Sequence, residues 1–567
     1  MNTLSQFHSV RLDTAKCKGC TNCIKRCPTE AIRVRGGLAQ ITEDRCVDCG
    51  ECIRVCPNVA KYAVADTLDR LDEFTYRIAL PAPSLFAQFG PEVPPGRILD
   101  GLRAIGFDDV FEVALAAEVA TLAFACHLAC NRQRPAISSA CPAVVRLIQV
   151  RFPSLVAQIV PVEAPMEVAA RMARSRLPRS VKRPGMFFIS PCPAKITAAT
   201  QPVGCERSGV DGVLSMGAVY AELVRVLPEL TDAPRGFEAS GLGYGWGRAG
   251  GEALALAGHQ CLAVDGIANV AEVLAEVERG QLEDIAFIEA QACTGGCVGG
   301  CLTVANPFVA RRWLRELAET LPPVPAARQE AYQVLVEEGL AAHSVVIQPR
   351  PLEGLSLDKT EAIARLRDLE ATLAGLPGLD CGSCGSPNCR ALAEDIVRGL
   401  ANVPDCHFKL SDRVQELAEE LAGLARRAPP AMGAKPPLSL EAISRQLGWR
   451  LAAGKAVPDR YVTGGYASDL LSDVIANARA GQVWVTCQSH PNIVAVAVLA
   501  ELAGIVVAGG RSPAPQTVQG AEREGLRLFV TAEDAFTAAG NLYRLLAGTT
   551  EGPKPARESE AKGGGDR

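Results

Sequence analysis

Cysteines at metal-ligand spacing are the residues of this sequence best suited to chemistry. Two runs, Cys17–Pro28 and Cys46–Pro57, repeat three cysteines with two residues between neighbours, then a fourth cysteine followed by proline. In this pattern a tight loop wraps three thiolates around one 4Fe-4S cubane, and the fourth cysteine reaches the other cluster. Zinc or disulfide pairs explain it less well, because zinc sites need no crossed fourth ligand before a proline. We predict two electron-carrying cubanes, cluster one on Cys17, Cys20, Cys23 and Cys56, and cluster two on Cys46, Cys49, Cys52 and Cys27.

Four further cysteines lie in three scattered segments. Cys141 precedes Pro142 at the predicted start of a helix, where backbone N–H groups favour a thiolate anion. Cys192 follows an apolar run at a predicted strand end, where α/β folds commonly place their sites. Cys293 and Cys297 are four residues apart, so on a helix they would share one face. Together the segments predict one buried iron-sulfur site with four thiolates.

The order and content of these segments resemble the three signature motifs of the iron-only (FeFe) hydrogenases. The resemblance implies that Cys141, Cys192, Cys293 and Cys297 bind a 4Fe-4S cubane, and that Cys297 also bridges to a two-iron subcluster. It further implies CO and cyanide ligands and a bridging azadithiolate on the two irons. Lys195 matches the family lysine that contacts a cyanide, and a fixed cation beside an anionic complex is electrostatically favourable.

One departure from the family pattern concerns proton supply. Ala140 stands where catalytic members carry a proton-transfer cysteine, and the segment from Phe111 ends in Leu122-Ala-Phe124 instead of carboxylates. A positioned acid or base typically contributes roughly 100 to 10,000-fold to a rate. We therefore expect slow turnover, as in the sensory branch of the family, with Glu112 and Glu118 left open as another proton path. Cys301 is either an extra thiol near the site or a small core residue, and we favour the second interpretation.

A later cysteine group, Cys381, Cys384, Cys389 and Cys406, resembles the small 4Fe-4S domain of electron-transfer complexes and corrinoid iron-sulfur proteins. It predicts a fourth cubane, with zinc as the weaker alternative. Further on, Asp459–Asp473 resembles the DRTGG family, with Tyr461 and Val462 inserted, which implies a regulatory module. Its Gly464-Gly465 pair is interpreted as a turn with positive φ, with ligand binding left open as the alternative.

The pattern of elements predicts an α/β multidomain protein. Strand-like and helical runs alternate in the central region, which favours a largely parallel sheet, and a proline-rich segment reads as a linker. The predicted parts are a two-cluster ferredoxin-like domain (1–75), an H-cluster domain (76–322), a helical connector (323–372), a small helical 4Fe-4S domain (373–427), a linker (428–438), an α/β DRTGG-like domain (439–548) and a disordered tail (549–567).

Composition excludes several classes of function. A net charge of -5 with 21% charged residues gives no basic excess, so we expect no nucleic-acid partner. The apolar stretch from Ile493 to Gly510 carries Glu501 and reads as a buried helix running into a buried strand, so we expect no membrane span. Since no secretory signal is recognisable, we expect a cytoplasmic protein with metal thiolates in place of disulfides.

These observations favour a slow, sensory FeFe-hydrogenase-like protein with four 4Fe-4S clusters. The expected partners are H2 and protons, a redox protein such as ferredoxin, and a signalling kinase or phosphatase. Two alternatives stay open: a high-turnover hydrogenase, and an iron-sulfur electron-transfer or assembly protein that lacks the two-iron unit.

Overall fold

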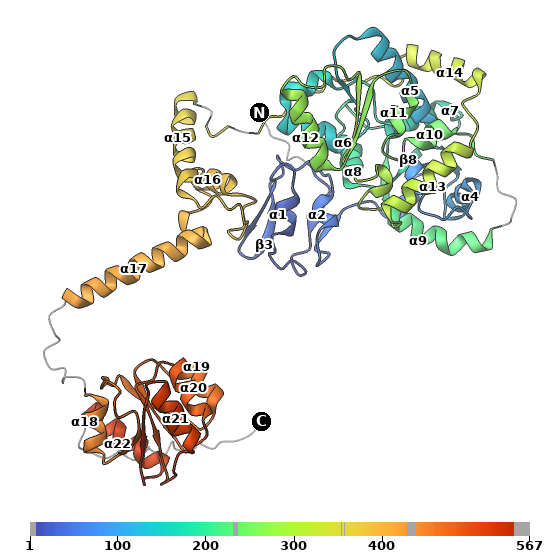
Figure 1. The fold of residues 1–567 in the computed structure, drawn as a ribbon. Helices are drawn as coiled ribbons and strands as arrows, with labels where there is room; N and C mark the ends of the chain where they lie inside the picture. Colours follow the sequence, from blue (N-terminus) through green and yellow to red (C-terminus); the bar gives the residue numbers. More distant parts are fainter. Residues whose placement is uncertain (1–6, 231–235, 353, 357, 428–437, 549–567) are drawn as a thin grey trace, which may run out of the picture. The chain divides into compact units, whose positions relative to one another are not determined.

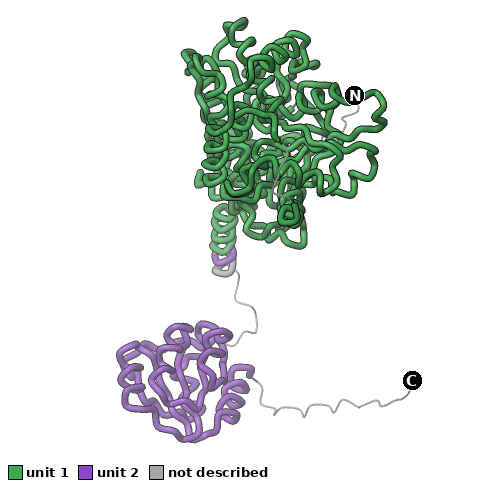
Figure 2. Tube along the Cα trace, turned by 90° about the vertical axis from the view of Figure 1, so that its right-hand side faces the viewer, with its two compact units in different colours: residues 1–419 green, residues 420–567 purple. Residues whose placement is uncertain are grey.

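The computed structural model describes residues 7–230, 236–352, 354–356, 358–427 and 438–548. The chain divides into two compact units, unit 1 (Met1–Glu419) and unit 2 (Glu420–Arg567), shown in Figure 2. The linker predicted at 428–438, except residue 438, and the tail predicted at 549–567 lie outside the described residues. The α/β multidomain class predicted from the sequence is confirmed.

Unit 1 begins with a small region built from two similar halves. Its two antiparallel strand pairs are β1 with β4 and β2 with β3, and one short helix follows each cysteine loop. The elements are β1 (Val10–Leu12), α1 (Asn22–Arg26), β2 (Ile32–Arg35), β3 (Leu38–Ile41), α2 (Glu51–Arg54) and β4 (Lys61–Ala63).

The central region of unit 1 holds two parallel sheets, where the sequence predicted one. The first has the order β6-β5-β8-β9, and the second β10-β11-β7. The strands are β5 (Tyr76–Pro81), β6 (Asp109–Val110), β7 (Ala136–Ile137), β8 (Pro184–Ser190), β9 (Gly212–Ser215), β10 (Cys261–Asp265) and β11 (Phe287–Gln291). Because β8 is buried along nearly its whole length, its sequence is continuously apolar and does not alternate.

Helices cover both sheets (Figure 1). Proline is the first residue of α3, α4, α6, α7, α8 and α13, where its missing N–H costs no hydrogen bond. The helices are α3 (Pro83–Phe86), α4 (Pro95–Ala104), α5 (Val113–Cys130), α6 (Pro142–Arg151), α7 (Pro165–Arg176), α8 (Pro193–Thr200), α9 (Met216–Val226), α10 (Gly241–Gly245), α11 (Gly251–Ala255), α12 (Ile267–Glu278), α13 (Pro307–Thr320) and α14 (Ala326–Glu337). Short 3-10 helices cover Leu68–Glu73, Pro153–Gln158, Leu227–Glu229, Cys297–Gly299 and Val403–Asp405.

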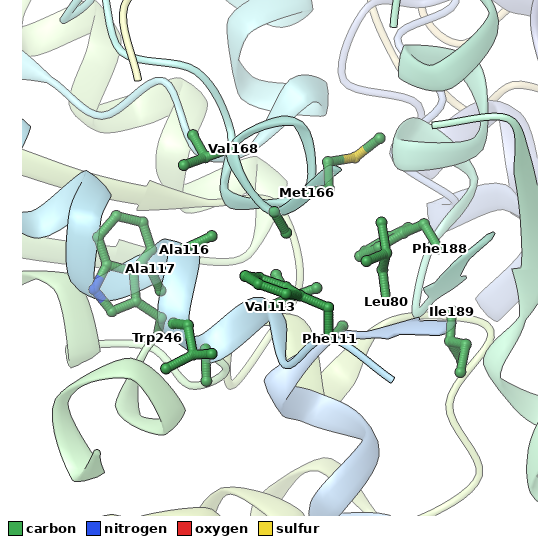
Figure 3. Packing of buried hydrophobic residues seen from close by; sticks show 14 of the residues in the cluster. Leu80, Phe111, Val113, Ala116, Ala117, Met166, Val168, Phe188, Ile189 and Trp246 are labelled. Atoms are coloured by element: carbon green, nitrogen blue, oxygen red, sulfur yellow. The ribbon is translucent and has the colours of Figure 1, made fainter. Parts of the chain in front are cut away.

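Each sheet has its own apolar core. Figure 3 shows part of the larger core, in which side chains from β5, β8, α5 and α7 pack beside an indole ring: Leu80, Phe111, Val113, Met166, Phe188 and Trp246. The glycine-rich stretch 241–247 serves close packing, because a Cβ on Gly243 would lie 2.2 Å from the Ala114 carbonyl oxygen.

One helix in the described part of the chain, α5, is apolar and long enough to cross a membrane by length and composition alone. Two thirds of it, 67%, is buried inside the protein. It packs against α7, α10 and α14, and Tyr332 of α14 donates a hydrogen bond to the Glu118 carboxylate of α5 at 2.9 Å. These contacts are those of a core helix, and they attach α14, which the sequence assigned to the connector, to the central region.

Three helices end unit 1: α15 (Lys359–Gly375), α16 (Cys389–Val397) and α17 (His407–Arg427), the last of which continues across the boundary between the units. Unit 2 is a five-stranded sheet of order β12-β16-β15-β14-β13, parallel except for β12. Its elements are α18 (Leu440–Gln446), β12 (Arg450–Ala453), β13 (Gly464–Ala467), α19 (Leu471–Asn477), β14 (Gln482–Thr486), α20 (Asn492–Leu499), β15 (Gly504–Val507), α21 (Pro515–Arg523), β16 (Arg527–Val530) and α22 (Ala535–Ala547). The buried helix and strand predicted between 493 and 510 are confirmed as α20 and β15.

Candidate metal centre

The eight cysteines of the duplicated run surround two separate cavities. One cavity, of about 310 Å³, is lined by Cys17, Cys20, Cys23 and Cys56. The other, of about 350 Å³, is lined by Cys27, Cys46, Cys49 and Cys52. The structure therefore brings together the two crossed sets that the spacing predicts, and four thiolates around each cavity suit a cubane.

Backbone donors stand at equivalent places in the two halves. The Ala31 N–H donates to Cys27 Sγ at 3.2 Å, and the Ala60 N–H donates to Cys56 Sγ at 3.3 Å. In both halves the donor comes four residues after the cysteine that crosses to the other cavity. Hydrogen bonds of this kind stabilise a thiolate and influence the potential of a bound cluster.

Lys61 distinguishes the first ferredoxin cavity, and the sequence analysis did not identify it. Its side chain lines the cavity of Cys17 and Cys56, is only 2% exposed, and has no hydrogen-bond partner for Nζ. Its position five residues after Cys56, on β4, was the available signal, but spacing alone does not reveal burial.

The third cavity lies at the carboxyl ends of β5, β8 and β11 and has a volume of about 790 Å³. It borders both apolar cores. All six residues predicted for the H-cluster line it: Ala140, Cys141, Cys192, Lys195, Cys293 and Cys297. Much of its remaining wall is apolar and includes Val113, Met166, Phe188 and Trp246.

Local structure places the four cysteines in two ways. Cys141 is the N-cap residue of α6, as the Cys141-Pro142 pair predicts. Cys192 follows the end of β8, as predicted, and is also the N-cap residue of α8. The helix considered for the segment from Cys293 to Cys297 does not form. This segment is a tight loop after β11. Gly295 and Gly296 adopt φ values of +83° and +91°, which end any helix and turn both cysteines into the cavity.

Lys195 lies directly beside the cysteines. Its Nζ is 3.6 Å from Cys297 Sγ, and the side chain is buried. Burial alone would lower the pKa of Lys195, but the surrounding thiolates, Cys297 first, raise it above its ordinary value. Burial also raises the pKa of Cys192 to about 11, so a bound metal ion is what would hold this sulfur as a thiolate.

A buried carboxylate pair at the same cavity was missed from the sequence. Glu252 lines the cavity and accepts a hydrogen bond from Ser138 Oγ at 2.5 Å. The Gln291 amide nitrogen donates to Glu252 at 3.4 Å and to Glu289 at 3.0 Å. Burial, then the Glu289 charge, raises the pKa of Glu252 to about 8, and burial also raises that of Glu289. The pair therefore holds a proton beside the cavity near neutral pH.

One protein-family model matches this region. Residues 75–257 and 248–301 match the model for the iron only hydrogenase large subunit, C-terminal domain. The chain contains an iron-only hydrogenase domain.

Two further family models match outside the hydrogenase domain. Residues 9–57 match the 4Fe-4S dicluster domain, and residues 376–408 match a model for an Fe-S cluster. One component of the ion-translocating oxidoreductase complex of Thiobacillus denitrificans is 37% identical over 71 residues, which are 12% of this chain. The matched part spans 38% of that relative's length.

Solved structures give more distant likenesses. Two variants of the FeFe-hydrogenase HydA1 of Chlamydomonas reinhardtii have TM-scores of 0.39 and 0.40 at 17% and 16% identity. They cover 49% and 50% of this chain and 95% and 99% of their own. The CBS and DRTGG domains of a Clostridium perfringens pyrophosphatase, solved with diadenosine tetraphosphate, have a TM-score of 0.17 at 15% identity and cover 20% of this chain and 53% of theirs.

Two carboxylates left open as a proton path in the hydrogenase domain fix the position of a neighbouring segment. Glu112 accepts hydrogen bonds from the Tyr244 hydroxyl at 2.6 Å and from the Glu238 N–H at 2.6 Å. Glu118 accepts from the Ser240 N–H at 2.6 Å. Neither residue lines the central cavity. Both carboxylates hold the segment around residues 238–244 against α5.

The second ferredoxin cavity adjoins the central cavity of the hydrogenase domain, because Cys49 lines both. Next to it, the buried Asp48 accepts a hydrogen bond from Thr197 Oγ1 at 2.9 Å and pairs with Arg146 at 3.6 Å. Cys301, interpreted as a core residue, lies at this junction, since a Cβ on Gly50 would lie 2.5 Å from its Sγ. Burial raises the pKa of Cys301 to about 12.

The small Fe-S region packs against the half of the ferredoxin domain that carries α1. The Val34 N–H donates to the Gly385 carbonyl at 2.8 Å, and Lys25 donates to the Pro387 carbonyl at 2.9 Å. Arg33 pairs with Asp395 at 2.6 Å. Three of its cysteines, Cys384, Cys389 and Cys406, share one small core, whereas Cys381 is exposed. His407, next to Cys406, is also exposed.

In unit 2 the turn predicted at Gly464-Gly465 is wrong. Both glycines belong to β13, and neither has a positive φ. A Cβ on Gly465 would lie 2.7 Å from a methyl group of Leu542, so the small residue lets α22 pack on the sheet. The DRTGG-like assignment of this unit continues to rest on its sequence motif.

Proposed function

We propose that this protein reacts with H2 at an H-cluster in the central cavity and passes electrons through 4Fe-4S clusters, slowly and in a sensory role. The volume of the central cavity carries this proposal. It is about 790 Å³, more than twice either ferredoxin cavity, although each is surrounded by one set of four predicted ligands. The extra room suits a second group beside a cubane.

The residues around that extra room suit a two-iron unit. Lys195 supplies a buried cation for cyanide ligands, and Gln291 has an amide oxygen without a hydrogen-bond partner at the cavity. A bound two-iron unit would supply the cleavage of H2 into two electrons and two protons. The protein's own part is to hold the complex, to exclude water with an apolar wall, and to hold an exchangeable proton at the Glu252–Glu289 pair.

The arrangement of the cysteine sites supports a linear electron route. Cys49 joins cluster two to the central cavity, and the loop of Cys381 lies beside α1, since a Cβ on Gly382 would be 2.9 Å from Lys25 Cε. We propose that electrons pass from the central site to cluster two and reach the 381–406 site through the ferredoxin domain. The last site has an exposed cysteine, Cys381, where a redox partner such as ferredoxin could exchange electrons.

Slow turnover follows from the residues at the proton-transfer positions. Ala140 lines the cavity and cannot donate a proton, and Phe124 is fully buried, stacked on Trp246 at 5.7 Å between ring centroids. A low rate fits a protein whose redox state is read by a partner. We propose a cytoplasmic signalling kinase or phosphatase as that reader, with unit 2 as the regulatory module.

Infrared spectroscopy of anaerobically matured protein tests this function. We expect bands of iron-bound CO and cyanide that shift when H2 is added, together with a low turnover rate. A Cys297→Ala variant should lose these bands and keep the ferredoxin signals. Absence of the bands, when a known hydrogenase matured in parallel shows them, would reject the H-cluster, and a high rate would reject the sensory role.

A further inference from the structure

Helix α17 presents a row of apolar side chains to solvent. Leu410, Val414, Leu417 and Leu421 follow one another at steps of four, three and four residues. Their exposed fractions are 43%, 57%, 41% and 66%. Within unit 1 the helix extends away from α15 and α16 (Figure 1). We call these four residues the α17 seam.

The spacing of the α17 seam is that of a coiled coil. Alternating steps of three and four place residues at positions a and d of a heptad, here Val414 and Leu421 at a, and Leu410 and Leu417 at d. A helix that packs on a globular core usually has a wider apolar stripe. The narrow seam therefore fits one partner helix of the same kind.

We propose that α17 pairs with α17 of a second copy of this chain as an antiparallel two-stranded coiled coil. The charges beside the seam decide the orientation, because residues at e and g set partner and direction. The g positions are Arg413 and Glu420, and the e positions are Ser411 and Ala418. In a parallel pair g faces e, so each charge would meet a small neutral residue.

An antiparallel pair brings g opposite g. When Leu410 packs opposite Leu421 of the second copy and Val414 opposite its Leu417, Arg413 faces Glu420, and symmetry makes this ion pair twice. In the single chain Arg413 forms an exposed ion pair with Glu416 of its own helix at 3.0 Å. Replacing this pair by the Arg413–Glu420 pair of the dimer costs little free energy, because exposed ion pairs contribute little to stability. The helix has 21 residues, or three heptads, so we expect a dimer that dissociates on dilution.

Sedimentation velocity on the full chain with its clusters, across a concentration series, tests the proposal. We expect the wild type to move from monomer to dimer, and Leu417→Asp on the seam to stay monomeric. Gln415→Asp puts the same charge on the outer face of α17 and should dimerise normally. Iron content and the electron paramagnetic resonance (EPR) spectrum confirm that each variant has folded.

Charge reversal tests the orientation. Arg413→Glu or Glu420→Arg alone should weaken dimerisation about tenfold, and the double reversal should restore it. A wild type that stays monomeric at all concentrations, because another part of the same chain covers the seam, overturns the proposal. A dimer that survives Leu417→Asp also overturns it, and single reversals without effect overturn the antiparallel pairing.

Discussion

The ferredoxin cavities and the central cavity each have a set of four cysteines but differ in volume and in the groups around them. Each is surrounded by four predicted cysteine ligands, but the ferredoxin cavities have volumes of about 310 and 350 Å³ and the central one about 790 Å³. Only the central cavity borders a carboxylate pair that shares one amide donor, Glu252 with Glu289. This difference agrees with the proposed functions, in which the ferredoxin cavities hold only electron-carrying clusters and the central cavity also needs space and a group that holds a proton.

The largest effect should come from removing a crossed ligand. Cys27→Ala should abolish or convert cluster two, although Cys27 belongs to the first run, because its sulfur lines the cavity of Cys46 and Cys52. EPR spectra and iron content of the reduced protein measure this loss. Cys130→Ala, at an exposed cysteine outside every cavity described above, is the matched control. If Cys27→Ala removed the cluster of Cys17 and Cys20, the crossed assignment would be wrong.

A smaller effect should come from placing a thiol proton donor at position 140 of the central cavity. Ala140→Cys places a thiol on the cavity wall, next to Ser138, which bonds both the Ala140 N–H and Glu252. Because a positioned acid contributes about 100-fold or more, H2 evolution should rise by up to about 100-fold. Ala143→Cys, also on the cavity wall, is the control and should give no rise. An unchanged rate in Ala140→Cys would mean that proton supply is not limiting.

The buried charge of Lys61 distinguishes the cluster-one cavity from the cluster-two cavity. Lys61→Met removes a buried cation from the cluster-one cavity, and the reduced cluster, which carries one more negative charge, should lose stabilisation. A tenfold decrease in the equilibrium constant for reduction of this cluster lowers its midpoint potential by about 59 mV. EPR-monitored redox titration measures this shift.

Two control variants test whether the shift in midpoint potential comes from the buried charge of Lys61. Lys18→Met removes the same charge from the same cavity, but Lys18 is exposed to solvent, so the shift should be much smaller. Lys61→Arg keeps the charge and should keep the potential. Equal shifts for Lys18→Met and Lys61→Met would show that burial of the ammonium does not matter.

Sequence reasoning found the cysteines because ligand spacing is local. Short segments were enough to predict the crossed sets, the helix start at Cys141, the strand end before Cys192, and the core helix and strand around Ile493. Short segments could not predict the division into two sheets, the burial of Lys61 or the proximity of Glu252 and Glu289. These features depend on contacts between distant segments. Gly464-Gly465 was misassigned because glycine serves close packing as well as turns.

The smallest expected effect concerns how the stability of the central region depends on pH. The pKa of Glu252 is raised from 4.5 to about 8, so the folded state binds this proton more tightly than the unfolded chain. Its contribution to stability is therefore complete below pH 4.5 and is lost as the pH rises through about 8, by at most about 1.4 kcal/mol per pH unit. Glu252→Gln should flatten this decline in urea unfolding of the loaded protein, whereas Glu338→Gln, on the surface, should not. Parallel pH curves for the wild type and Glu252→Gln would mean that Glu252 does not hold a proton beside the central cavity.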